Sequence, residues 1–402
     1  MNMGGNERFD AVVIGGGPAG ATAASELARQ GQAVLLLDRA GRIKPCGGAI
    51  PPRLIRDFDI PDHLLVARAT SACMVSPSDR RVEMPINGGY VGMVDRGQFD
   101  EWLRERAAAC GAERRTGLFE RLTRDDDGTP VVHYQPAGDS DGAELKTVRA
   151  RIVIGADGAN SAVARQTMPP GERPPYVFAY HEIVRSPARG SVAGFDGSRC
   201  HIFYRGTLSP DFYAWVFPHG ETTSVGTGSA QKGFSLRGAV GAVRAEFGLD
   251  AVETLRCEGA PLPLRPRRRW DNGRDVVLIG DAAGAVAPAS GEGIYYAMLT
   301  GRLAAEATAR ALMTGRPREL AMVRKAFMAE HGRVFWILGL LQRFWYANDR
   351  RREQFVSICR DPDVQHLTWE AYMNKRLVRA KPSAHLRIFF KDLAHLLRLV
   401  SP

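Results

Sequence analysis

Glycines and an aspartate near the start of the chain have the spacing that binds the phosphates and sugar of a dinucleotide. The apolar segment 10–14 is followed by Gly15-Gly-Gly-Pro-Ala-Gly20 and a helical run, and Asp38 ends the next apolar segment. In such a turn Gly15 permits the tight bend, Gly17 lets the backbone approach a pyrophosphate, and Gly20 lets helix and strand pack closely. The helix N-terminus then presents unpaired N–H groups to the phosphates, and Asp38 can accept hydrogen bonds from an adenosine ribose.

Two later motifs are predicted to contribute to the same ligand site. Asp157-Gly158 follows an apolar segment, and so does Asp281, which is followed by Gly291-Glu-Gly293. Either motif alone is typical of an ordinary β-turn. An aspartate at the carboxyl end of a strand faces the ligand crevice of an open sheet. We therefore expect Asp281 to bind a sugar-like hydroxyl, and the helix after Gly293 to stabilise negative charge on the ligand.

The elements that must position these motifs indicate an α/β (α+β) fold. Apolar strands are expected at 10–14, 34–38, 151–154 and 275–279, a helix at 293–313, and a large antiparallel sheet over 176–262, where apolar and polar residues alternate. This predicts a Rossmann-type domain with an inserted antiparallel-sheet domain and a helical C-terminal tail. The expected ranges are 1–64, 95–165 and 274–314 for the dinucleotide domain, 65–94 and 166–273 for the substrate domain, and 315–402 for the basic helical region.

An aromatic strand and a nearby cysteine are the candidates for substrate chemistry. Alternation places Tyr213, Trp215 and Phe217 on one face of a strand, as either a substrate-tunnel wall or a core stripe. Cys46 precedes Gly47-Gly48 and is expected to be either a proton donor or a packing residue. No spacing links His181, His201 or His219 to a carboxylate, so these histidines are expected to be structural.

Composition excludes several classes of protein. The 402 residues carry a formal net charge of +10, but no basic stripe interleaved with aromatics, so we expect no nucleic-acid partner. The six cysteines form no C-x-x-C pair, so we expect no metal site, and scattered cysteines suit a reducing cytoplasm. The first residues suggest no signal peptide, and no apolar run reaches 18 residues. The aromatic stretch 334–346 and the basic amphipathic stretch 385–400 either lie on an anionic membrane surface or pack on the core.

Four motifs carry a resemblance to a known family. They are Lys44-Pro-Cys-Gly-Gly-Ala-Ile-Pro51, Asp95-Arg96-x-x-Phe-Asp100, Tyr213-Ala-Trp-Val-Phe-Pro218 and Ala289-Ser-Gly-Glu-Gly-Ile-Tyr-Tyr-Ala297. The sequence from Phe9 to Leu312 resembles the p-hydroxybenzoate hydroxylase-like FAD oxidoreductases. Within them it looks most like the geranylgeranyl reductases of chlorophyll and bacteriochlorophyll synthesis. One departure from the hydroxylase pattern is Gly284, where those enzymes often have histidine.

The resemblance implies FAD as cofactor and NADPH as reductant, although the chain has no second dinucleotide fingerprint. It implies reduction of isolated double bonds in a geranylgeranyl chain, on a prenylated pigment or a prenyl diphosphate, by a protein associated peripherally with a photosynthetic membrane. The alternatives are an aromatic hydroxylase or halogenase of the same fold, or a non-catalytic flavoprotein that carries pigment. From the motifs and the resemblance together, the residues expected to bind the cofactor are Gly15, Gly17, Ala19, Gly20, Asp38, Arg39, Gly47, Gly48, Arg96, Asp157, Gly158, Asp281, Gly291, Gly293 and Ile294.

Overall fold

The computed structural model describes residues 7–39, 46–138, 144–188, 190–192 and 194–375. The chain forms two compact units, each assembled from three segments. The first unit comprises 1–43, 97–176 and 261–337, and the second comprises 44–96, 177–260 and 338–402. These divisions differ from the predicted ranges: residues 46–64 group with the second unit, and 315–337 group with the first. The assignment of cofactor and substrate to separate domains stays a prediction.

The first unit is built on a mixed six-stranded sheet that carries the predicted apolar strands. Strand β1 pairs in parallel with β2 and β10, β2 pairs in parallel with β8, and β10 with β16. Strand β9 is antiparallel to its neighbours β8 and β10. The buried runs in β1, β2 and β10 are continuous, as expected for parallel strands covered on both faces. The strands are β1 (Arg8–Ile14), β2 (Val34–Asp38), β8 (Glu113–Arg124), β9 (Pro130–Pro136), β10 (Lys146–Gly155) and β16 (Val276–Leu278).

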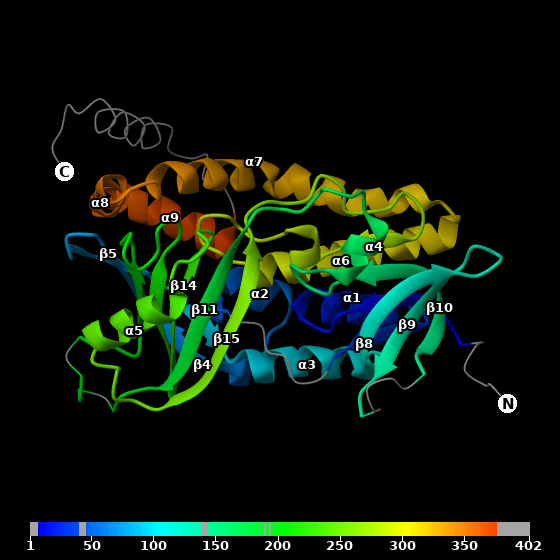
Figure 1. The fold of residues 1–402 in the computed structure, drawn as a ribbon, viewed down its shortest axis with the longest axis horizontal. Helices are drawn as coiled ribbons and strands as arrows, with labels where there is room; N and C mark the ends of the chain where they lie inside the picture. Colours follow the sequence, from blue (N-terminus) through cyan, green and yellow to red (C-terminus); the bar gives the residue numbers. More distant parts are fainter. Residues whose placement is uncertain (1–6, 40–45, 139–143, 189, 193, 376–402) are drawn as a thin grey trace. The chain divides into compact units, whose positions relative to one another are not determined.

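Two helices of this unit, α1 and α6, pack closely because small residues line their contact (Figure 1). A Cβ atom on Gly301 of α6 would lie only 2.4 Å from the Ala19 carbonyl oxygen of α1. Glycine at this position therefore lets the two backbones approach each other. The helical elements are α1 (Pro18–Arg29), α3 (Arg96–Ala109), α4 (Ala162–Thr167), η2 (Gly280–Ala283), α6 (Ile294–Thr314), η3 (Pro317–Ala321) and the first part of α7 (Met322–Trp345).

The second unit is built on a seven-stranded sheet in the order β15-β11-β14-β13-β12-β5-β6. The predicted large antiparallel sheet is present, and β5 and β12 within it pair in parallel. Its core includes Phe203, Val216 and Val225 of the sheet packed against Val240 and Val243 of α5. The elements are β5 (Ser71–Val75), β6 (Arg81–Pro85), β11 (Tyr176–Arg185), β12 (Arg199–Phe203), β13 (Ala214–His219), β14 (Thr222–Ser229), β15 (Thr254–Pro263) and α5 (Leu236–Glu246).

A small sheet in the order β3-β7-β4 holds the Cys46–Gly48 segment in place. The Val94 N–H at the end of β7 donates to the Gly48 carbonyl at 2.9 Å. The segment therefore lies beside the Asp95-Arg96 motif that follows β7. The remaining elements of this unit are β3 (Ala49–Ile50), α2 (Pro52–Asp57), η1 (Asp62–Leu64), β4 (Leu65–Ala69), β7 (Val91–Val94), α8 (Asp349–Ile358) and α9 (Pro362–Asn374).

The helical character predicted for the C-terminal region is present between Pro317 and Asn374, in η3, α7, α8 and α9. Among the described residues, no helix is both long enough and apolar enough to cross a membrane. The predicted amphipathic stretch 385–400 lies outside the described residues.

Candidate active site

The three glycine–aspartate motifs meet at one edge of the first unit's sheet. Ile14 is in register with Leu37 and with Gly155, and Gly155 is in register with Leu278. Because these strands are parallel, the segments that follow them all emerge at the carboxyl edge. The three motifs therefore lie together at the edge where open parallel sheets bind their ligands, and the ligand that they share stays a prediction.

In the β1–α1 turn, close backbone contacts require glycine at two positions, and a third glycine leaves the space at its Cβ position open. Gly15 has φ +105°, and a Cβ atom there would lie 2.4 Å from the Ala156 carbonyl oxygen. A Cβ atom on Gly20 would lie 1.9 Å from the Gly15 carbonyl oxygen. A Cβ atom on Gly17 would meet nothing within 4 Å, and no side chain caps α1. The open N-terminus of α1 therefore fits a pyrophosphate group.

Asp38 lies over this turn and is held there by an arginine that the sequence analysis missed. A Cβ atom on Gly16 would lie 2.8 Å from the Asp38 carboxyl carbon. Arg104 of α3 pairs with Asp38 Oδ2 at 3.3 Å and donates to the Gly16 carbonyl, also at 3.3 Å. No local sequence pattern distinguishes Arg104 from the other arginines of α3. The neighbouring Arg39 is exposed.

Asp157 caps a helix within the second motif. Its Oδ2 atom accepts the N–H groups of Ala162 and Val163 at 2.6 and 3.1 Å, at the start of α4. Its Oδ1 atom is buried with no hydrogen-bond partner among the described residues. Burial raises the pKa of Asp157 despite these hydrogen bonds. Gly158 has φ +86° and open space at its Cβ position. One oxygen thus orders the turn, and the other is left for a ligand group.

The third motif places Asp281 beside the N-terminus of α6. Gly293 precedes the first residue of that helix, Ile294, and a Cβ atom on Gly293 would lie 3.8 Å from Asp281 Oδ1. Glu292 accepts the Tyr295 N–H of the first turn at 3.0 Å. The open space at Gly17 and Gly158, the orphaned Asp157 oxygen and the Asp281 carboxylate fit a ligand that carries phosphate and hydroxyl groups, as FAD does. The individual residue roles stay predictions.

In the second unit, the aromatic strand shares one face as predicted. The Trp215 ring centroid lies 5.9 Å from that of Tyr213 and 6.2 Å from that of Phe217. The rings of Tyr213 and Phe217 are half-buried, and Trp215 is buried. A Cβ atom on Gly47 would lie 2.8 Å from the Phe217 ring, so Gly47 permits the segment to lie against this strand.

Cys46 is in the same neighbourhood and is half-buried. Its Sγ atom accepts the Gly48 N–H at 3.4 Å. Gly48 has φ +64°, and a Cβ atom there would lie 2.4 Å from His219 Nε2. Both glycines are therefore explained by contacts within the second unit, and their predicted cofactor role stays a prediction.

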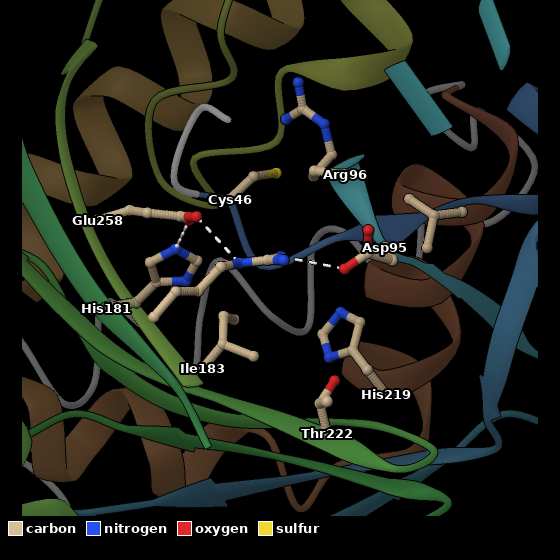
Figure 2. A pocket seen from close by; sticks show the side chains of 10 residues that line it. Cys46, Asp95, Arg96, His181, Ile183, His219, Thr222 and Glu258 are labelled. Atoms are coloured by element: carbon tan, nitrogen blue, oxygen red, sulfur yellow. Dashed lines mark hydrogen bonds and ion pairs between the residues drawn. The ribbon is translucent and has the colours of Figure 1, made fainter. Parts of the chain in front are cut away.

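A polar pocket in the second unit contains groups that the sequence did not link (Figure 2). His181 Nε2 lies 2.6 Å from Glu258 Oε2, and Arg256 donates to Asp95 Oδ2 at 3.0 Å. The sequence spacing gave no indication of this carboxylate partner of His181. The pair is 77 positions apart in sequence and meets because β11 and β15 are neighbours in the sheet. The pocket is lined by Cys46, Val94, Asp95, Arg96, His181, Ile183, His219, Thr222, Arg256 and Glu258.

The other two histidines are buried. His219 donates its Nδ1–H to the Phe217 carbonyl at 2.8 Å, and burial lowers its pKa to about 4. His201 packs edge-on against Phe247 with its centroid 4.6 Å away, and burial lowers its pKa to about 4. Both are neutral at physiological pH. Among the described residues, no cluster of metal-ligating side chains occurs.

The comparisons with known proteins cover nearly the whole chain. The family model described as FAD binding domain matches residues 8–321. The chain is 56% identical over 395 residues to a protein of Rhodobacter capsulatus named geranylgeranyl diphosphate reductase, covering 98% of this chain and 99% of that one. Among solved structures, a geranylgeranyl bacteriochlorophyll reductase-like protein from Thermoplasma acidophilum matches with a TM-score of 0.78 at 21% identity, covering 94% of this chain and 99% of that one. The flavin-dependent brominase Bmp2 matches with a TM-score of 0.74 at 18% identity, covering 98% and 100%.

Proposed function

We propose a prenyl-chain reductase activity for this chain, which belongs to the geranylgeranyl diphosphate reductase family and is an FAD-dependent oxidoreductase. The proposed reaction saturates isolated double bonds of a geranylgeranyl chain to give a phytyl chain, with NADPH as the reductant. The substrate is either geranylgeranyl diphosphate or a geranylgeranyl-(bacterio)chlorophyll. The observation that carries the proposal is the 56% identity, which extends over 98% of the chain.

The chemistry of an isolated alkene explains which features the enzyme needs. Such an alkene has no carbonyl group to polarise, so its saturation requires a hydride, a proton and a dry apolar wall that holds the chain in register. Bound FAD supplies the hydride after its reduction. We propose that Tyr213, Trp215 and Phe217 form part of the apolar wall, because the Trp215 ring contacts the rings of both other residues.

The test is an anaerobic two-stage reaction. The purified enzyme is reduced with NADPH and then mixed with geranylgeranyl diphosphate or, separately, with geranylgeranyl-bacteriochlorophyll. We expect the flavin to be reoxidised, which its absorbance reports. We also expect mass spectrometry to show a product that is heavier by two hydrogens for each reduced bond. The arm that reacts identifies the substrate. No reoxidation by either compound would contradict the proposal.

A hydroxylase or halogenase remains the second candidate because the brominase Bmp2 shares the fold. A likeness at 18% identity indicates the fold alone, so oxygen consumption must separate the two functions. A monooxygenase consumes oxygen together with its organic substrate, whereas the proposed reductase works without oxygen. A pigment-carrying flavoprotein without catalytic activity would form no product under either condition.

We further propose that the protein associates peripherally with an anionic membrane surface. From residue 333 onward, the exposed face of α7 carries Trp336 (71% exposed), Leu340 and Leu341, with exposed Arg333 and Arg343 on either side. A tryptophan between apolar and basic side chains suits the lipid–water interface, and each basic residue near an anionic surface contributes about 1 kcal/mol. A diterpenoid substrate partitions into a membrane, so binding to the membrane surface would bring the enzyme to its substrate.

Vesicle co-sedimentation tests this association. Trp336→Ser is expected to reduce binding to phosphatidylglycerol vesicles, and high salt is expected to reduce it further. The matched control is Met313→Ser, because Met313 is an exposed apolar residue (79%) of another helix, α6. Equal binding by Trp336→Ser and the wild type would show that this face of α7 does not contact the membrane.

A further inference from the structure

A continuous chain of polar contacts in the second unit joins the aromatic strand to the polar pocket. The Trp215 indole N–H donates to Ser224 Oγ at 3.0 Å, and Ser224 Oγ lies 3.0 Å from His181 Nδ1. His181 Nε2 in turn lies 2.6 Å from Glu258 Oε2. The proposed apolar wall is therefore connected to a histidine–carboxylate pair through a single hydroxyl group.

The sheet topology makes this chain possible, and a glycine provides the space for it. Trp215 is on β13 and His181 is on β11, and both are in register with Gly226 of the intervening strand β14. A Cβ atom on Gly226 would lie 2.2 Å from the indole ring and 2.7 Å from His181 Cβ. Because that atom is missing, the indole can cross β14 and place its N–H at Ser224. The Trp215 and His181 rings are tilted, with their centroids 6.5 Å apart.

At the pocket end, the fixed charges cancel. The pocket is lined by two arginines, Arg96 and Arg256, and by two carboxylates, Asp95 and Glu258. Arg256 bridges the carboxylates, with its Nε 2.9 Å from Glu258 Oε1 and a terminal nitrogen 3.0 Å from Asp95, as the dashed lines in Figure 2 mark. His219 is neutral, as described above. The net charge of the pocket therefore depends on the proton content of the His181–Glu258 pair and of Cys46.

The surroundings of His181 accept both of its protonation states. When the ring is neutral, the Ser224 hydroxyl can donate to Nδ1 while Nε2–H donates to Glu258. When the ring is doubly protonated, Nδ1–H can donate to Ser224 Oγ instead, because a hydroxyl group both donates and accepts. Ser224 Oγ accepts from Trp215 in both states. His181 can thus gain or lose a proton without leaving a ring nitrogen unpaired, which suits an acid–base group better than a fixed structural residue.

We propose that the His181–Glu258 pair holds and delivers the proton that saturation of the double bond consumes, an inference that rests on the proposed function. Glu258 presents this proton, because its side chain is 14% exposed at the pocket, whereas that of His181 is 2% exposed. The doubly protonated ring of His181 passes its Nε2 proton to Glu258 Oε2, and the neutral ring keeps Nδ1–H, which donates to Ser224 Oγ. The O–H bond of the carboxyl group breaks as the π electron pair of the alkene forms the new C–H bond, and the other carbon takes the hydride of the reaction. Glu258 is left as a carboxylate beside Arg256, and a proton from solvent water restores the doubly protonated ring.

Two other proton-bearing groups nearby, His219 and Tyr213, are less suited to this step. His219 has its Nδ1–H committed to the Phe217 carbonyl and stays neutral. Burial raises the pKa of the Tyr213 hydroxyl, which makes it a weaker acid than an exposed phenol. Cys46 is half-buried in the same pocket, and its Sγ atom accepts the Gly48 N–H.

The test compares His181→Gln and Glu258→Gln with the wild-type holoenzyme in both half-reactions. Reduction of the flavin by NADPH is expected to change little. Reoxidation by geranylgeranyl diphosphate is expected to slow by about 10²–10⁴-fold, the usual contribution of a general acid. In the wild type this rate should fall with rising pH and fall in D₂O, because the pair must carry its proton, and both dependences should disappear in the variants. The matched control is His201→Gln, which removes an equally buried histidine from the same sheet.

A second readout does not require turnover. Ring ¹⁵N spectra of His181 in the holoenzyme, recorded over a range of pH, are expected to show both the neutral ring and the imidazolium. In Glu258→Gln the imidazolium should be less populated at the same pH, because an amide does not stabilise it as a carboxylate does. Unchanged reoxidation rates in both variants, or a His181 ring that keeps one state over this range, would overturn the proposal. If the wild type reduces no geranylgeranyl compound, the proposed function fails, and the ring spectra still decide whether the pair exchanges a proton.

Discussion

Replacement of Gly17 by alanine should separate the ligand's requirements from those of the fold. Gly17 has φ −72° and ψ −175°, a conformation open to any residue, and its Cβ position is empty within 4 Å. Alanine at the helix N-cap lowers the free energy of unfolding by up to about 1 kcal/mol relative to glycine. It also raises the free energy of unfolding by about 0.4–1 kcal/mol, because alanine restricts the unfolded chain more than glycine does. The free energy of unfolding of the FAD-free protein should therefore change by less than about 0.5 kcal/mol.

The FAD affinity of this variant should fall sharply, because the methyl group occupies the space left for the pyrophosphate. Loss of one or two hydrogen bonds to a charged group costs about 3 kcal/mol, which corresponds to roughly a 100-fold increase in Kd. Urea denaturation of the FAD-free protein and fluorescence titration with FAD measure the two quantities. Unchanged FAD affinity, or a clear loss of stability, would refute this reasoning. Gly20→Ala is the contrasting variant, since its Cβ atom would lie 1.9 Å from a carbonyl oxygen and should cost about 1–3 kcal/mol of stability.

Three further variants have distinct expected outcomes. Asp281→Ala should weaken FAD binding by about 1.5–3 kcal/mol in the same titration, and unchanged binding would show that its carboxylate does not contact the ligand. Trp215→Ala should slow flavin reoxidation by substrate roughly 100-fold and flavin reduction by NADPH much less, as stopped-flow traces would show, because displacement of the reacting carbon by about 1 Å costs that much. Hydrogen bonds from Arg114 and Arg104 outweigh partial burial and lower the pKa of Glu101 from 4.5 to about 2. Glu101 therefore stabilises the fold above pH 4.5, and this contribution is lost as the pH falls through 2. Glu101→Gln should cost about 1 kcal/mol at pH 7, a value reduced for solvent screening, and almost nothing below pH 2 by urea denaturation.

The sequence predicted the carboxyl edge of the first unit because each of its motifs is local. A glycine turn, its preceding strand and its following helix are contiguous, and parallel pairing then brings Gly15 and Asp281 to one edge without further information. The alternation of Tyr213, Trp215 and Phe217 predicted their shared face for the same reason, since period two is a local property of a strand.

The polar pocket could not be predicted in this way. His181 and Glu258 meet only because β15 is the neighbour of β11, and strand order is a property of the whole chain. Arg104 reaches Asp38 across 66 positions, again through tertiary packing. The helix-capping role of Asp157 was not predicted either, since capping by its Oδ2 atom depends on where the short helix α4 begins.

The fold shared with a brominase means that the chemistry must be decided by side chains rather than by architecture. An oxygen-using relative and a reductase both need a reduced flavin, but only the reductase must protonate a carbon atom of its substrate. Here the aromatic side chains of β13 and the His181–Glu258 pair lie on either side of β14, and Ser224 of that strand connects them. Replacement of Ser224 by alanine would leave Trp215 and the His181–Glu258 pair in place but disconnected, so it should impair substrate reoxidation more than it impairs FAD binding. If it impaired only FAD binding, the chain of hydrogen bonds would be a feature of folding rather than of the reaction.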